Sequence, residues 1–111
     1  MAAVATLVEQ WDEIVQRQPR DWSSLYLRLH LRDPAQSEEA ALAMSPLNPW
    51  HDGDWRSGVF HFRAARRYGY GAAAQLCRKR LSTLDGLGIV GTLTLERQIS
   101  DVRPVHTQGV A

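Results

Sequence analysis

The sequence predicts an α+β fold in which helices cover one face of a sheet and leave the other face open. Segments with apolar residues at helical spacing alternate along the chain with segments in which apolar and polar residues strictly alternate. Each expected strand has one apolar and one polar side, so only one side needs a helical layer. We therefore expect a two-layer sandwich, a single domain over residues 1–100, followed by a flexible tail at 101–111.

The first two elements have the clearest periodicity. Residues 3–17 predict an amphipathic helix that ends before Pro19, because proline cannot continue the helical hydrogen bonds. Residues 25–32 predict a strand with four leucines on one side. The side chains expected on its other side are Tyr26, Arg28, His30 and Arg32.

A second helix is expected over 34–44. Asp33 is placed as its N-cap, Pro34 at its first position, and Gln36 three residues after the cap as in a capping box. The helix should stop at Ser45-Pro46.

A β-hairpin is expected next, with its turn at Asp52-Gly53. A short strand at 47–51 would precede the turn, and Pro49 would confine it to an edge of the sheet. A longer strand at 56–66 would follow. Its apolar side should carry Phe60, Phe62 and Ala64, and its other side Val59, His61, Arg63 and Ala65.

The chain should close with a third helix and a last strand. The helix is expected over 71–85, with Cys77 among its inward residues and Gly86 as its C-terminal stop. The last strand alternates Leu93, Leu95 and Ile99 against Thr92, Thr94 and Glu96.

This order of elements predicts the topology. Without the extra N-terminal helix it is the βαββαβ arrangement of a ferredoxin-like sandwich. If the short strand at 47–51 is absent, a three-stranded βαβαβ sheet with a similar open face remains.

Composition indicates an ordinary folded domain with an uneven charge distribution. The chain has 111 residues, 44% of them hydrophobic, and a net charge of +1. Residues 55–84 contain seven basic side chains and no acidic one, whereas residues 1–54 contain nine acids and four bases. Such asymmetry indicates a polar partner on one side. Twelve of the thirteen basic residues are arginine, a bias that a GC-rich coding sequence also produces.

The sequence predicts a cytoplasmic protein that contacts no membrane. The N-terminal segment lacks the basic region of a signal peptide, and no run of about 18 apolar residues occurs. The single Cys77 cannot form an internal disulfide, which favours a reducing compartment.

The first candidate site is a basic strand-turn-helix corner. Two glycines precede the third helix, whose N-terminal N–H groups have no capping side chain nearby and are flanked by arginines. The spacing matches neither a Walker loop nor G-x-G-x-x-G. Water and Gly71 could also satisfy these donors. The residues of this candidate anion or nucleic-acid site are Arg63, Arg66, Arg67, Gly69, Gly71, Arg78, Lys79 and Arg80.

The second candidate site is the open face of the sheet with a tryptophan-flanked hairpin. Its residues are Tyr26, Arg28, His30, His61, Trp50 and Trp55. Only Tyr26 is an aromatic residue in phase with this face, whereas single-strand platforms use several stacking rings. Trp50 and Trp55 either pack on each other or stand exposed as interface anchors. Cross-strand ion pairs on a solvated face remain a further interpretation.

Catalysis and metal binding have weaker support. His30 and His61 could face each other beside His51, Asp52 and Asp54, but no metal-ligand spacing occurs and Asp-Gly-Asp is typical of a turn. No nucleophile elbow or carboxylate pair stands out. We expect no catalytic residue, no metal and no cofactor.

The leading hypothesis is a non-catalytic binding module that contacts a polyanion, nucleic acid first, through the basic corner. The alternative is a protein-interaction or homodimerisation module that uses the open sheet face and the hairpin. A third class, an enzyme with an anionic substrate at the same corner, stays open.

Overall fold

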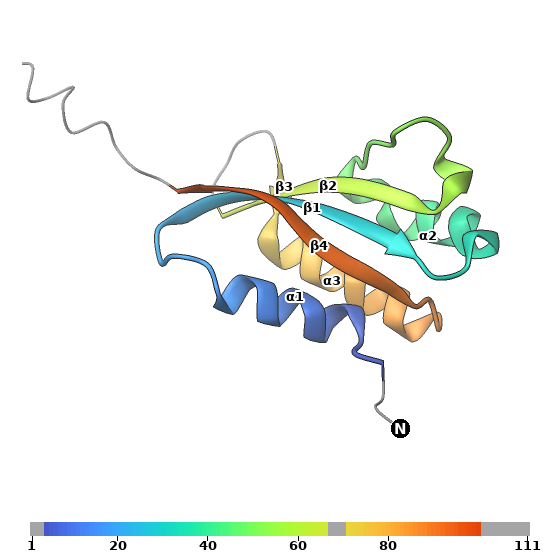
Figure 1. The fold of residues 1–111 in the computed structure, drawn as a ribbon, viewed down its shortest axis with the longest axis horizontal. Coiled ribbons are helices and arrows are strands. Elements are labelled where there is room, and N and C mark those ends of the chain that lie inside the picture. Colours follow the sequence, from blue (N-terminus) through green and yellow to red (C-terminus); the bar gives the residue numbers. More distant parts are fainter. Residues whose placement is uncertain (1–3, 67–70, 101–111) are drawn as a thin grey trace, which may run out of the picture.

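The computed structural model describes residues 4–66 and 71–100 of the chain. Its elements follow one another as shown in Figure 1: α1 (Leu7–Gln16), β1 (Trp22–Leu31), η1 (Pro34–Gln36), α2 (Ser37–Met44), η2 (Ser45–Leu47), η3 (Trp55–Ser57), β2 (Val59–Ala65), β3 (Ala72–Ala73), α3 (Ala74–Gly86) and β4 (Gly91–Ser100). The fold is α+β, with three α-helices and a mixed sheet of strand order β3-β2-β1-β4. The segments 67–70 and 101–111, and with them the expected tail, lie outside the described residues.

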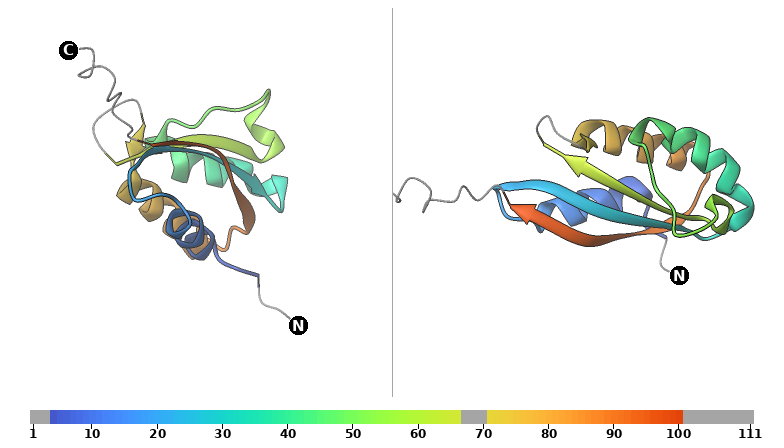
Figure 2. Two further views of the ribbon diagram at one scale, coloured as in Figure 1. Left: turned by 60° about the vertical axis from the view of Figure 1, so that its left-hand side comes forward. Right: turned by 90° about the horizontal axis from the view of Figure 1, so that it is seen from above.

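The sheet is built around β1, which pairs antiparallel with β2 on one side and with β4 on the other. The two-residue β3 pairs parallel with the outer edge of β2. Figure 2 shows the helices lying against one face of this sheet. Within the described part of the chain, no helix is long and apolar enough to cross a membrane.

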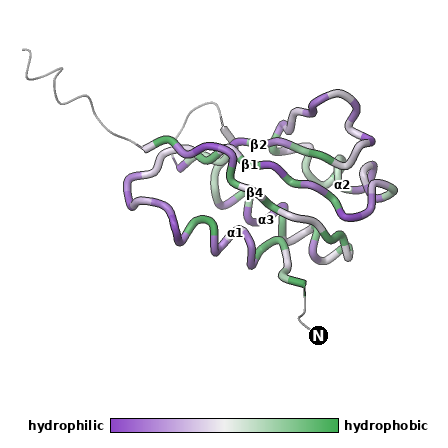
Figure 3. Tube along the Cα trace, viewed as in Figure 1, coloured by the Kyte–Doolittle hydropathy of each residue, from purple (hydrophilic) through white to green (hydrophobic). Residues whose placement is uncertain are grey.

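The strict alternation predicted for β1 is present. Leu25, Leu27 and Leu29 are fully buried under the helices, whereas Arg28 and His30 are exposed on the opposite side. Figure 3 shows this alternation as changes of colour along β1. The cross-strand partners of the leucines include Phe60 and Phe62 of β2, also fully buried. One continuous apolar core therefore lies between the sheet and the helices.

The ferredoxin-like strand order is wrong, because residues 47–51 form no strand. The chain continues from α2 into η2, turns at Asn48 with a left-handed φ of 49°, and then reaches Pro49, which has no N–H to donate. Only Trp50 pairs with β2, through one isolated bridge to His61. The edge strand of the sheet is instead β3, which precedes α3 in the chain. It pairs parallel with the outer edge of β2, beside the single bridge from Trp50.

Several element boundaries differ from the sequence expectation. Asp33 does cap, but it accepts from Ala35 at the start of the 3₁₀ turn η1, and Gln36 completes no capping box. The expected long strand begins only at Val59, because Asp54 caps η3 instead. The helix α3 begins after β3 rather than at residue 71, and its C-terminal left-handed residue is Gly88, with φ of 76°, rather than Gly86.

A β-bulge changes the second half of β4. Leu27 pairs with Leu95, but the next residue of β1, Tyr26, pairs with Arg97, so Glu96 is the extra residue. Arg97 thereby moves to the face of Tyr26. The expectation that Ile99 shares a face with Leu93 and Leu95 is wrong, because after the bulge Ile99 lies opposite Ser24.

Two long-range contacts fix α1 in the helical layer. The carboxylate of Asp85 on α3 accepts hydrogen bonds from the backbone N–H groups of Leu7 and Val8, at 2.8 and 3.0 Å. The side-chain amide of Gln10 donates to the carbonyl of Gly91 and accepts from the N–H of Leu93, at 2.9 and 2.8 Å. Gln10 thus covers the outer edge of β4 as a neighbouring strand would.

Candidate binding face of the sheet

The open face of the sheet brings basic and aromatic side chains together in two rows across the strands. In one row, Tyr26 of β1 lies between Arg63 of β2 and Arg97 of β4. In the next row, Arg28 lies between His61 and Thr94. Since neighbouring positions on one face of a sheet are close enough for long side chains to touch, the three arginines form one basic surface.

Tyr26 is held between two guanidinium groups. The central carbon of the Arg63 guanidinium lies 5.3 Å from the centre of the tyrosine ring, and that of Arg97 lies 5.5 Å from it. Arg63 also donates from Nε and Nη2 to the hydroxyl of Ser24, at 3.2 and 2.9 Å. Among the described residues, neither arginine has a carboxylate within ion-pair distance.

Trp50 adds a second aromatic ring to this face. Its backbone N–H donates to the carbonyl of His61 at 2.8 Å, and its carbonyl accepts from the His61 N–H at 2.9 Å. The indole stacks on the imidazole of His61, with ring centres 5.8 Å apart and planes inclined by 15°, and meets Tyr26 edge-on at 6.2 Å. Trp50 remains 42% exposed, so one side of the ring can receive a ligand.

Trp55 lies apart from this cluster. It begins η3 and has the guanidinium of Arg56 at 5.8 Å from its ring centre. The ring partners of Trp50 are Tyr26 and His61. Of the two tryptophans expected on the interface, Trp50 is thus the one that joins the face.

His61 is a buried polar side chain of the face. Its Nδ1 lies 2.7 Å from Oε1 of Glu96, and its Nε2 lies 2.9 Å from Oδ2 of Asp52. His30 is exposed and lies opposite Val59 and Thr92, so the expected pairing of His30 with His61 is wrong. Within the described ranges, no group of three or more His, Cys, Asp or Glu side chains is placed to hold a metal ion.

The bases of the expected corner are divided between the two layers. Arg63 lies on the open face, and Arg66 stacks at 4.2 Å over Trp22 at the end of β2. Arg78 and Lys79 are exposed on α3, in the helical layer, and Arg80 is half-buried there. Arg67 and Gly69 lie outside the described residues.

Arg78 is engaged by the neighbouring helix. Its Nε and Nη2 donate to the two carboxylate oxygens of Asp12 on α1, both at 2.9 Å. These hydrogen bonds lower the pKa of Asp12 and raise the pKa of Arg78 from their usual values. This arginine therefore joins α1 to α3.

Gly71 has a packing role. A Cβ atom at this position would lie 2.9 Å from Cγ and 3.0 Å from the backbone oxygen of Arg63, so no larger residue fits without movement of β2. The N-cap residue of α3 is Ala73, which makes no side-chain hydrogen bond to the helix. Gly71 thus brings the chain close to β2 rather than capping the helix.

The only cysteine of the sequence is buried in the core on α3, and burial raises the pKa of Cys77 to about 12. The thiol is therefore protonated at neutral pH and is a poor nucleophile. We expect a chromogenic thiol reagent at neutral pH to label the native protein far more slowly than the protein unfolded in denaturant. Equal labelling rates would contradict this burial.

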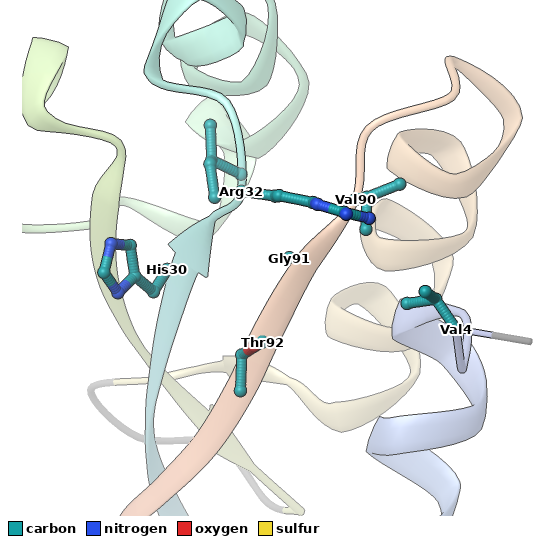
Figure 4. A pocket seen from close by; sticks show the side chains of 7 residues that line it. Val4, His30, Arg32, Val90, Gly91 and Thr92 are labelled. Carbon is teal, nitrogen blue, oxygen red and sulfur yellow. The ribbon is translucent and has the colours of Figure 1, made fainter. Parts of the chain in front are cut away.

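A broad hollow of about 500 Å³ lies at one end of the sheet, where β1 ends and β4 begins. Figure 4 shows the side chains of His30 and Arg32 pointing in different directions around it. Gly91 is required at its base, since a Cβ there would lie 2.8 Å from the backbone oxygen of His30. Without convergent polar groups, the hollow has the shape of a surface depression rather than of a small-molecule site.

No family model, curated protein or solved structure matches the chain.

Sequence reasoning missed two features of the face. Arg97 joins it only because of the bulge at Glu96, which alternation cannot reveal. The contacts of His61 with Asp52 and Glu96 join a loop and two strands. The strand alternation does place His61 and Glu96 on the same polar face, which is a partial indication of their contact. The contact with Asp52 has no such indication, because Asp52-Gly53 is typical of an ordinary turn.

Proposed function

We propose that this protein is a non-catalytic binding module that holds single-stranded nucleic acid on the open face of its sheet. The observation that carries the proposal is Tyr26 between Arg63 and Arg97, two guanidinium groups without a carboxylate partner among the described residues. As part of this proposal the protein acts in the cytoplasm.

The chemistry of the face suits an extended polyanion with flat rings. Unpaired bases stack on aromatic side chains, and the exposed side of Trp50 offers such a surface. The ring of Tyr26 orders the two guanidinium groups that lie over it. Guanidinium groups bind phosphates through paired donors. Arg63 has its guanidinium oriented by Ser24, and Arg28 is exposed in the adjacent row. Bases and phosphates of one strand can thus be bound together.

The proposed site lies on the open face of the sheet rather than at the basic strand-turn-helix corner that the sequence predicted. Arg63 is part of both sites. Lys79 and Arg78 lie in the helical layer, and Arg78 is already paired with Asp12. We therefore assign the ligand to the face that also offers aromatic rings.

Fluorescence anisotropy with a labelled single-stranded oligonucleotide, as RNA and as DNA, tests the proposal. Binding should weaken steeply with salt, and Arg97→Ala should reduce the slope of log K against log salt by about 0.7 for each phosphate that this arginine neutralises. Lys79→Ala, on α3, should leave the slope unchanged. Arg17→Ala is the matched control, because Arg17 is exposed after α1 and pairs with Glu13.

Absence of binding at low salt would refute the proposal. If Lys79→Ala reduced the salt slope as much as Arg97→Ala, the binding site would be the basic corner rather than the sheet face.

A protein interface is the second candidate function. Trp, Tyr and Arg are the residues that dominate binding energy in protein interfaces, and Trp50, Tyr26 and Arg63 supply all three on one surface. If the face binds a second copy, sedimentation should give a mass that rises with concentration, and Trp50→Ala should abolish the rise. A constant monomer mass combined with salt-dependent oligonucleotide binding would favour nucleic acid.

A further inference from the structure

We propose that His61 is a positioning residue, held as a doubly protonated imidazolium between Asp52 and Glu96, and that it keeps Trp50 in place for ligand binding. The ligand should then bind more tightly when His61 is protonated. The statement about binding rests on the proposed function, whereas the state of His61 does not.

The hydrogen-bond geometry leads to this inference. Both ring nitrogens of His61 lie at hydrogen-bond distance from a carboxylate oxygen, 2.7 Å to Glu96 and 2.9 Å to Asp52. An ionised carboxylate can only accept, and a neutral imidazole carries one N–H. Both contacts are therefore hydrogen bonds only when both nitrogens carry a proton.

The surroundings of His61 can support that charge. Its side chain is 6% exposed, and the carboxylates of Asp52 from the loop and Glu96 from β4 face it from two sides. The other charged side chains on this face are Arg28, directly opposite on β1, and Arg63 and Arg97 in the next row. Two adjacent carboxylates offset the imidazolium and part of the arginine charge.

Trp50 depends on His61 in two ways. Two backbone hydrogen bonds join the residues, and the indole lies flat against the imidazole at 5.8 Å. An aromatic face is attracted to a cation, so protonation strengthens this stacking. Asp52, two residues after Trp50, ties the same loop to the imidazolium. The loop that carries Trp50 is thereby fixed on the sheet by one charged ring.

Removal of one proton reverses this arrangement. The ring could then donate to only one carboxylate, and the other would face a nitrogen lone pair at close distance. Asp52 is 78% exposed on a loop, whereas Glu96 is part of β4, so we expect Asp52 to move away. Trp50 would keep its two backbone hydrogen bonds to His61, but its indole would stack on an uncharged ring and be held less firmly. Binding should therefore weaken when His61 loses this proton.

The first arm of the test examines the free protein. In a long-range ¹⁵N–¹H NMR spectrum at mildly acidic pH, the ring nitrogens of His61 should both have the shifts of protonated imidazolium. Asp52→Asn and Glu96→Gln should each change the resonance of the ring nitrogen that faces the replaced side chain, because each removes one carboxylate acceptor. A neutral tautomer of His61 at acidic pH would overturn the proposal.

The second arm measures oligonucleotide binding over a pH range of about 5 to 9, which brackets ordinary histidine titration. The wild type should bind at least about fivefold more weakly at the basic end than at the acidic end. His61→Gln should bind weakly with a flat profile, and the control Arg17→Ala, which lies after α1 and outside the face, should keep the wild-type profile. Thermal unfolding of His61→Gln checks that the variant is folded.

The two arms fail separately. An imidazolium in the NMR spectrum with no oligonucleotide binding at any pH would refute the proposed function and leave the state of His61 established. Binding that does not respond to pH in the wild type would refute the positioning role.

Discussion

Replacing Phe62 with alanine is expected to lower the free energy of unfolding by about 3 to 5 kcal/mol. Phe62 is fully buried on the helical side of β2, where it pairs with Leu27 of β1. Its removal deletes the transfer free energy of the ring and leaves a cavity between the layers. A domain of this size has a stability of about 5 to 15 kcal/mol, so the decrease should be evident in a urea unfolding curve.

The matched control for Phe62→Ala is Thr94→Ala. Thr94 is exposed on the open side of β4, and its replacement should change the free energy of unfolding by no more than about 0.5 kcal/mol. Equal decreases for the two variants would contradict the assignment of the core to one side of the sheet.

Replacing Tyr26 with alanine should weaken oligonucleotide binding by about tenfold, since the ring orders two guanidinium groups and each cation–π contact contributes about 0.5 to 2 kcal/mol. The effect should be large because the ring occupies the centre of the face, between Arg63 and Arg97 and beside Trp50. Its removal also deletes the surface against which both guanidinium groups are ordered. Fluorescence anisotropy at constant salt measures the change.

Tyr26→Phe is the control that separates the ring from the hydroxyl. The variant keeps the stacking surface and should bind within about twofold of the wild type. If both variants bind like the wild type, the sheet face is not the ligand site. If Tyr26→Phe weakens binding as much as Tyr26→Ala, the hydroxyl rather than stacking carries the interaction.

These two predictions address opposite sides of the same sheet. The buried side consists of leucine and phenylalanine and stabilises the fold. The open side carries charged side chains and partly exposed rings that are not part of the hydrophobic core. Substitutions on the open face should therefore change binding with little change in stability.

The alternation of apolar and polar residues correctly predicted which side chains of β1 and β2 face the core. The alternation along residues 25–32 predicted the buried leucines of β1 and the open position of Arg28, because the period of a strand is strictly two. Phe60 and Phe62 were placed in the core for the same reason. Local periodicity is strong where one face of a strand is apolar and the other polar.

Edge pairing was predicted poorly. The segment 47–51 had a plausible turn after it, yet only Trp50 pairs with β2. The edge is shared with β3, whose two alanines have no strand signal of their own. Pairing at an edge depends on which segment reaches it in space, and neither loop length nor residue type decides that.

Charge clustering in the sequence was only a partial guide to charge clustering in space. Residues 55–84 contain seven bases, but among the described ones Arg63 lies on β2 and Arg78, Lys79 and Arg80 lie on α3, so they belong to different layers. Arg63 reaches the open face and Arg78 reaches Asp12 on α1. Arg97, which completes the basic row, came from outside that segment.

The sequence by itself determined the α+β class and which sides of β1 and β2 are buried, because both follow from periodicity within a few residues. The tertiary structure alone decided the strand order, the shift of Arg97 to the face of Tyr26, and the meeting of Asp52, His61 and Glu96. These features need contacts between segments that are far apart in the chain. Such contacts depend on how the layers pack and on the position of the β-bulge in β4, and neither can be recognised from a short stretch of sequence.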